Sequence, residues 1–246
     1  MIRSTRHETA RARLACSSLL FGLAIAALTN GQSLGSATDG TRYRTLKSRI
    51  LDEKEKLVVR YTRTSDPSAR SGIDAEAAER LRTWLVDSIL PTWLGTTWGY
   101  NGTTQTPGLG QIACGYFVTT CLRDVGFDLP RVRLSQQPAE TIIGTFVQQS
   151  LRRRWSNAPI DQFVRDVSGM GQGVYLVGLD YHIGFLIVDT GAVAFWHASY
   201  LPPSMVIGED ALQSPILRAS RYRVVGRIIP NAMLIRRWLS AERFDH

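Results

Sequence analysis

The sequence has few of the residues that build disulfide scaffolds or metal centres. It contains three cysteines and four histidines in 246 residues, and no two cysteines have the Cys-x-x-Cys spacing of a zinc site or a redox pair. A glycine-rich phosphate loop, a G-x-S-x-G nucleophile elbow and a His-Glu-x-x-His helix are also missing from the sequence. These absences exclude the commonest phosphate-binding, serine-hydrolase and zinc-peptidase motifs.

Long apolar runs are also missing, apart from one near the N-terminus. That run, residues 14–28, follows four arginines and precedes a stretch of small and polar residues. It is shorter than the roughly 20 residues of a membrane span. This order predicts a secretory signal peptide over residues 1–37, with an uncleaved N-terminal anchor as the alternative. We therefore expect a secreted or periplasmic protein whose mature chain does not span a membrane.

The composition is that of a globular domain with a modest excess of positive charge. Apolar residues make up 44% and charged residues 20% of the chain, and the formal net charge is +8. Removal of residues 1–37 takes away four arginines and one glutamate, which leaves a mature charge near +5. Such a charge suits an anionic cell envelope. No basic stripe is interleaved with aromatic residues, so we expect no nucleic-acid partner.

The remaining chain divides into an irregular segment and a main domain. Residues 38–72 are charged and predict a linker, with a strand at 57–62 that docks on the main domain, residues 73–246. The basic residues of this linker, and the run 152–154, are interpreted as solvated faces, the latter at a helix end. A binding patch for anionic polymers is the alternative for residues 152–154.

The main domain has helical patterns first and strand patterns later. Helical spacing predicts a helix over residues 74–90, with Asp74 as its N-cap. Further helices are expected over these ranges: 112–125, 138–151, 159–167 and 231–240. Strand patterns occupy 173–179, 182–189, 192–199 and 221–229. Helices followed by an antiparallel sheet of about four to six strands predict an α+β domain.

Cys114 begins the second of these helices, directly after a glycine-rich loop. Unpaired amides and the dipole at a helix start favour a thiolate, which predicts a lowered pKa for Cys114 and a place for an oxyanion near Gly115. Cys121 lies two turns further on, about 10.5 Å away along the helix, beyond the ~7 Å that a disulfide allows. We expect Cys121 to belong to the core and Cys114 to remain a free thiol.

Two histidines occupy neighbouring strand patterns. If a turn of two or four residues joins the strands 182–189 and 192–199, Val188 pairs with Val193, and His197 lies opposite Gly184. His182 and His197 are then diagonal neighbours on one face, within about 7–8 Å. A three-residue turn would place them on opposite faces. A thiol, a base and an orienting group are what acyl transfer by a cysteine requires.

Three segments resemble the NlpC-type, papain-like bacterial cell-wall cysteine peptidases. IACGYFVTTCLRDVGFDLPR, residues 112–131, resembles their nucleophile helix with its following Gly and Leu-Pro-Arg. HIGFLIVDTGAVAFWHAS, residues 182–199, is similar to their His-Val-Gly strand and His-Ala strand, and GVYLVGL, residues 173–179, stands where their preceding strand lies. The resemblance covers roughly residues 98–200.

The resemblance implies a papain-like fold and a secreted hydrolase without a cofactor. Its nucleophile would be Cys114, its general base His182 and its orienting residue His197. The substrate would be an amide bond in the stem peptides of peptidoglycan.

The sequence departs from the family pattern beside the nucleophile. Ala113 replaces the usual acid, Gly115-Tyr116 replaces Ser-Gly, and the family tyrosine has only Trp98 and Tyr100 as candidate counterparts. An inactive relative that binds cell-envelope ligands is therefore the alternative. A zinc site of one Cys and two His is a further alternative, for which a fourth ligand and the characteristic spacing are missing.

Overall fold

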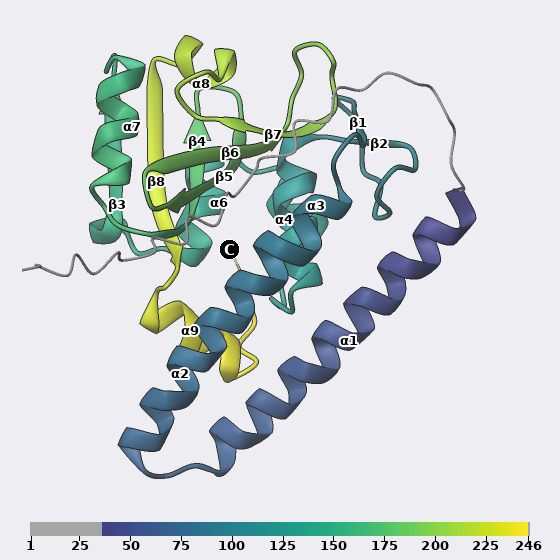
Figure 1. Ribbon diagram of the computed structural model, residues 1–246, viewed down its shortest axis with the longest axis vertical. Coiled ribbons are helices and arrows are strands. Elements are labelled where there is room, and N and C mark those ends of the chain that lie inside the picture. The colour runs from purple at the N-terminus through teal and green to yellow at the C-terminus, as the bar shows by residue number, and fades with distance from the viewer. Residues whose placement is uncertain (1–35, 246) are drawn as a thin grey trace, which may run out of the picture. The chain divides into compact units, whose positions relative to one another are not determined.

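The computed structural model describes residues 36–245, within the unit Gly35–His246 (Figure 1). The signal peptide is expected over residues 1–37, and residues 1–35 lie outside the described part of the chain. The signal peptide therefore stays a prediction. Within the described part of the chain, no helix combines the length and the apolar character that crossing a bilayer requires.

A six-stranded antiparallel sheet lies at the centre of this unit (Figure 1). Its strand order is β3-β8-β4-β5-β6-β7. The bounds are β3 Arg152–Ser156, β4 Gly173–Leu179, β5 Ile183–Asp189, β6 Ala192–Ala198, β7 Val206–Asp210 and β8 Tyr222–Ile229. A small parallel pair, β1 Thr97–Trp98 and β2 Gln111–Ile112, lies outside it. The mixed helix and sheet content agrees with the predicted α+β class.

The helices mostly precede the sheet in the sequence, as the pattern predicts. Their bounds are α1 Ser36–Arg63, α2 Pro67–Arg82, the π-helix η1 Thr83–Ile89, α3 Leu90–Thr92, α4 Cys114–Asp124, α5 Arg131–Ser135, α6 Ala139–Phe146, the 3₁₀-helix η2 Gln149–Leu151, α7 Ile160–Ser168, α8 Pro215–Ala219 and α9 Ala232–Leu239. The expected helices at 112–125, 159–167 and 231–240 are confirmed within a few residues. The helix expected over 138–151 ends at Phe146.

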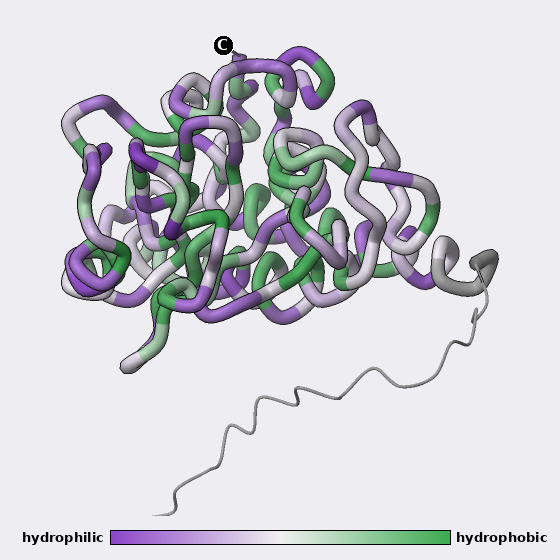
Figure 2. Tube along the Cα trace, turned by 90° about the horizontal axis from the view of Figure 1, so that it is seen from above, coloured by the Kyte–Doolittle hydropathy of each residue, from purple (hydrophilic) through white to green (hydrophobic). Residues whose placement is uncertain are grey.

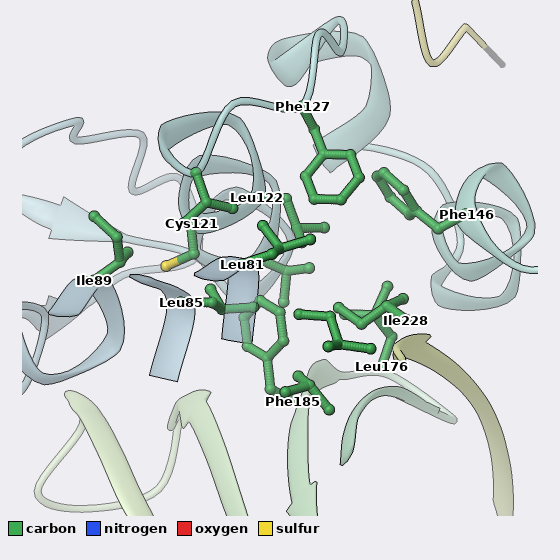
Figure 3. Close-up of a cluster of buried hydrophobic side chains, with 14 of the residues drawn as sticks. Leu81, Leu85, Ile89, Cys121, Leu122, Phe127, Phe146, Leu176, Phe185 and Ile228 are labelled. Atoms are coloured by element: carbon green, nitrogen blue, oxygen red, sulfur yellow. The ribbon is translucent and has the colours of Figure 1, made fainter. Parts of the chain in front are cut away.

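The first hydrophobic core lies between the helices and one face of the sheet. Figure 3 shows side chains from the helical segments meeting Leu176, Phe185 and Ile228 from three adjacent strands. Cys121 points into this core and is fully buried, as predicted. In Figure 2 the apolar stretches of the trace alternate with hydrophilic ones, and the latter form many of the outer turns. Burial of these side chains is the main source of stability.

A second core lies on the opposite face of the sheet, under α7 and α8. Phe163 and Val167 of α7 pack there with Leu217 of α8 and with alternate residues of β4, such as Tyr175. Because successive strand residues point to opposite faces, β4 contributes to both cores and is buried along its whole length. The sheet is therefore a rigid support with two covered faces.

The segment expected to be a linker with a docked strand is a long helix instead. Residues 57–62 belong to α1, so the strand prediction is wrong. The run is apolar enough to suggest a strand, but Tyr43, Ile50 and Leu57 recur at seven-residue spacing and are all buried. This spacing places them on one side of a helix. Helix α1 and helix α2 form a helical hairpin (Figure 1).

Two further local predictions are corrected. Helix α2 begins at Pro67 rather than after Asp74, because the Asp66 carboxylate accepts the Ala69 N–H and Pro suits the first helical turn. Asp74 lies inside the helix and accepts a hydrogen bond from Arg236. The basic run 152–154 belongs to strand β3, paired with β8, and not to a helix end.

Tyr43 fastens α1 to the rest of the fold and yields a first prediction. Its hydroxyl donates to the Asp124 carboxylate at 2.7 Å and accepts from the Trp93 Nε1–H at 2.9 Å. We expect Tyr43→Phe to lower the free energy of unfolding by about 1–3 kcal/mol, because both buried partners lose their hydrogen bond. Urea denaturation measures this, with Tyr61→Phe on the same helix as the matched control. Equal midpoints for the two variants would contradict it.

Candidate functional site

Cys114 is the first residue of α4, as the sequence predicts. Ala113 precedes the helix with an extended backbone and its carbonyl accepts from the Phe117 N–H, so the helix begins without a side-chain cap. Gly115 allows a close approach, since a Cβ there would lie 2.2 Å from the Ser135 carbonyl oxygen. The glycine that replaces the family's serine therefore sets the distance between α4 and the end of α5.

The two histidines lie on one face of the sheet, in the predicted register. Val188 pairs with Val193 across the turn. A Cβ on Gly184 would lie 2.9 Å from the His197 Cβ, which confirms that these two residues are opposite. His182 comes directly before β5, and its Nε2 lies 2.9 Å from the His197 Nδ1. Both side chains are buried.

A third strand adds Glu209, which the sequence reasoning missed. Its Oε1 lies 3.1 Å from the His197 Nε2. Strand β7 pairs with β6 so that Glu209 lies opposite Phe195, diagonal to His197 on the same face. The strand has five residues and was not predicted. The signal that could have revealed it is a carboxylate in a short alternating run, VIGED, after the two histidine strands.

These contacts set the positions of the imidazole protons. Burial opposes ionisation of Glu209, but hydrogen bonds from His197 and Ser214 outweigh it, and the Glu209 pKa lies below its usual value. The resulting carboxylate only accepts hydrogen bonds, so His197 carries its proton on Nε2 and accepts through Nδ1. His182 then donates from Nε2 and keeps its lone pair on Nδ1. That Nδ1 is buried and has no hydrogen-bond partner in the described residues.

The pKa of each histidine lies below its usual value, which favours the neutral ring near pH 7. Burial lowers the pKa of His182 well below 6.5, and the neighbouring His197 lowers it further. Burial also lowers the pKa of His197, although Glu209 acts in the opposite direction. The free Nδ1 of His182 is therefore available as a base down to mildly acidic pH.

The Cys114 thiol does not have the lowered pKa that its helix position predicts. Burial raises the pKa above the usual value of 9.0, and the backbone N–H groups of Ile183, Gly115 and Cys114 only partly oppose this effect. A buried thiolate loses more hydration than the helix start returns, which is why the prediction is wrong. The Ile183 N–H belongs to the residue after His182, so the sulfur lies beside the histidine strand.

The raised pKa gives a second prediction, for the pH dependence of alkylation. Since the thiolate is the reacting form, we expect the rate of Cys114 modification by iodoacetamide to keep rising through pH 9.0. A thiolate–imidazolium pair would instead give a plateau between pH 6 and 8. Mass spectrometry of the labelled peptide distinguishes Cys114 from Cys121, which is buried and serves as an internal control.

Cys114 and His182 line a common cleft of about 1120 Å³. From this pair the cleft extends to Glu140, Asp180 and Arg221, which we call the charged arm. A second space of about 460 Å³ extends from the same pair to Trp98, Tyr100, Asn101, Thr103 and Tyr116, which we call the neutral arm. Of the candidate residues, Trp98 lines the neutral arm, and Tyr100 lines both arms.

Metal binding finds no further support in this geometry. Among residues 36–245, no three His, Cys, Asp or Glu side chains are grouped so that they could hold a metal ion. The histidine nitrogens are bonded to each other, and His197 is bonded in turn to Glu209. A series of hydrogen bonds of this kind can pass a proton.

Taken in order, the described groups are a thiol, a base with a free nitrogen, an orienting imidazole and a carboxylate. Such an arrangement can transfer a proton from sulfur and form an acyl-sulfur bond. Comparisons of the chain with protein-family models, with curated proteins and with solved structures found no match.

Proposed function

We propose that this protein is a secreted or periplasmic cysteine hydrolase with a papain-like, NlpC-type domain, which cleaves an amide bond in peptidoglycan stem peptides. One observation carries the proposal. The buried His182 Nδ1 has no partner in the described residues. The other nitrogen of its ring is held by His197, and His182 lines the same cleft as Cys114. An unpartnered buried base costs stability, which a catalytic role would explain.

The proposed reaction proceeds through a thioester. The Cys114 thiol gives its proton to His182 Nδ1 while the sulfur attacks the amide carbon, and His182 then protonates the leaving amine as the C–N bond breaks. Water attacks the thioester after giving a proton to His182, and the C–S bond breaks as the thiol is restored. Backbone N–H groups at the start of α4 stabilise the oxyanion. Glu209 and His197 stabilise the imidazolium that forms in each step.

Digestion of purified sacculi tests the proposal. We expect the full mature chain to create new amino groups and to release soluble stem-peptide fragments, measured by chromatography, and Cys114→Ala to release no more than buffer alone. The matched control is Cys121→Ala, which removes the buried second sulfur and should retain activity. If the wild-type chain binds sacculi without cleaving amide bonds, the inactive binding module of the same fold replaces this proposal.

A further inference from the structure

The two arms of the cleft differ in chemistry. The charged arm contains Glu140, Asp180 and Arg221. The neutral arm has no Asp, Glu, Lys or Arg among its described lining residues. Its wall is made of aromatic, amide and hydroxyl side chains, which select a ligand that is polar and uncharged.

The neutral arm also exposes its rings to an unusual degree. Tyr100 is 83% exposed, Tyr181 95% and Tyr200 40%, and no other tyrosine is among the exposed large apolar side chains of residues 36–245. All three line both arms beside Cys114, so they lie where the neutral arm meets the charged arm. Exposed aromatic rings gathered at one place mark a binding surface, because their faces attract polarised C–H groups and their hydroxyls form hydrogen bonds.

Polar atoms in this arm are unused within the protein. The side chains of Tyr100, Asn101 and Thr103 form no hydrogen bond or ion pair in the part of the chain that is described. Gln136 donates to the Tyr116 hydroxyl at 3.3 Å, which leaves its amide oxygen free. A ligand with several hydroxyl or acetamido groups would satisfy these atoms.

An extended peptide fits the neutral arm less well. Peptides commonly bind by adding a strand to a free sheet edge. Here β1 has β2 on one side and a bridge from Thr97 to Met205 on the other. Strand β2 is likewise covered by a bridge between Ile112 and Thr103. Both short strands are therefore paired or bridged on two sides within residues 36–245, which favours a ligand held by ring faces and side-chain hydrogen bonds.

We infer that the neutral arm binds a pyranose sugar, so that the substrate is a glycopeptide whose scissile amide lies close to the sugar. This inference rests on the proposed function for the amide bond. The observations that support the sugar site are an uncharged recess, three exposed tyrosines, and unpaired hydroxyl and amide groups beside the nucleophile. The flat, apolar faces of a sugar ring would pack on Tyr100 and Tyr181, and its hydroxyl and acetamido groups would bond to Asn101 and Gln136.

Binding to Cys114→Ala tests the inference without turnover. The probes are an N-acetylglucosaminyl-N-acetylmuramyl dipeptide and the same dipeptide carrying only an N-acetyl group. Calorimetry should give roughly 10-fold tighter binding of the glycopeptide, and Tyr100→Ala with Tyr181→Ala should remove most of this difference. Both rings are exposed, so their removal should not unfold the protein. Tyr61→Ala, on α1 outside both arms, is the matched control.

Each outcome decides the inference. The inference would be overturned if the two probes bind with equal affinity or if neither binds. It would also be overturned if the tyrosine variant loses the same affinity for both probes, because the neutral arm would then hold the peptide. Equally efficient cleavage of sugar-free peptides would overturn the sugar site and leave the proposed hydrolase intact. Glycopeptide-specific binding without any cleavage by the wild-type chain would support the sugar site and remove the hydrolase.

Discussion

His182→Asn is expected to reduce kcat/KM for amide cleavage by roughly 10²- to 10⁴-fold, the usual contribution of a general base. The reason is the raised pKa of Cys114. Because the raised pKa keeps sulfur protonated at neutral pH, the proposed attack requires removal of the proton, and His182, which lines the same cleft, has an unpaired Nδ1. Asparagine retains a polar side chain of similar size and cannot take the proton. Steady-state kinetics on a soluble stem peptide measures the loss.

The pH profile gives this prediction a second readout. A base is active only when unprotonated, and burial lowers the His182 pKa well below 6.5. The acid limb of kcat/KM in the wild-type chain should therefore lie below pH 6.5, and it should disappear in His182→Asn. At pH values above the pKa of Cys114, the alkylation rates of the wild-type chain and of His182→Asn should become equal, because the thiol is already deprotonated and needs no base. Alkylation of Cys121, which is buried in the folded chain, would show that the variant has lost its fold. Unchanged kcat/KM would exclude His182 as the base.

The neutral resting state reconciles two features of the site. A helix start predicts a thiolate, yet burial raises the thiol pKa and lowers both histidine pKa values. In the proposed reaction, thiol and imidazole therefore stay uncharged until a substrate binds. The negative charge of Glu209 then has its effect when His182 takes the proton, since the imidazolium is bonded through His197 to a carboxylate. In the proposed reaction, the electrostatic stabilisation therefore acts on the protonated His182 and not on the resting site.

The sequence predicts the parts of the site that depend on local rules. Cys114 at a helix start follows from the glycine-rich loop and the amphipathic run after it. The shared face of His182 and His197 follows from strand alternation and the short turn, and the pairing of Val188 with Val193 confirms that register. Both are consequences of spacing over fewer than 20 residues.

The parts that were missed depend on contacts between distant segments. Glu209 becomes a partner of His197 only because β7 pairs with β6, and five residues give too weak a strand pattern to predict that pairing. The sequence predicts a linker where α1 lies because the apolar residues of this segment are sparse. Its Tyr43 finds Asp124 and Trp93 at sequence separations of 81 and 50 residues. Tertiary contacts of this kind override local propensity.

Glu209→Gln is expected to lower kcat/KM by roughly 10- to 10²-fold, the usual effect of a residue that supports a catalytic group through hydrogen bonds. The substitution keeps the size of the side chain and removes its charge. The imidazolium of His182 then loses its counterion, and the amide NH₂ can donate to His197 Nε2. In that orientation both tautomers reverse, and His182 Nδ1 carries a proton instead of a lone pair.

Nitrogen NMR of the imidazole rings separates this role from a structural one. In the wild-type chain His182 should show a protonated Nε2 and an unprotonated Nδ1, and in Glu209→Gln a measurable fraction of the opposite tautomer. The matched control is Glu242→Gln, an exposed carboxylate that pairs only with Arg237 near the C-terminus. It should change neither the tautomer nor the kinetics. If Glu209→Gln lowers the melting temperature while the His182 tautomer and kcat/KM remain unchanged, Glu209 supports the sheet and not the base, because a proton relay cannot lose its carboxylate without a change at His182 Nδ1.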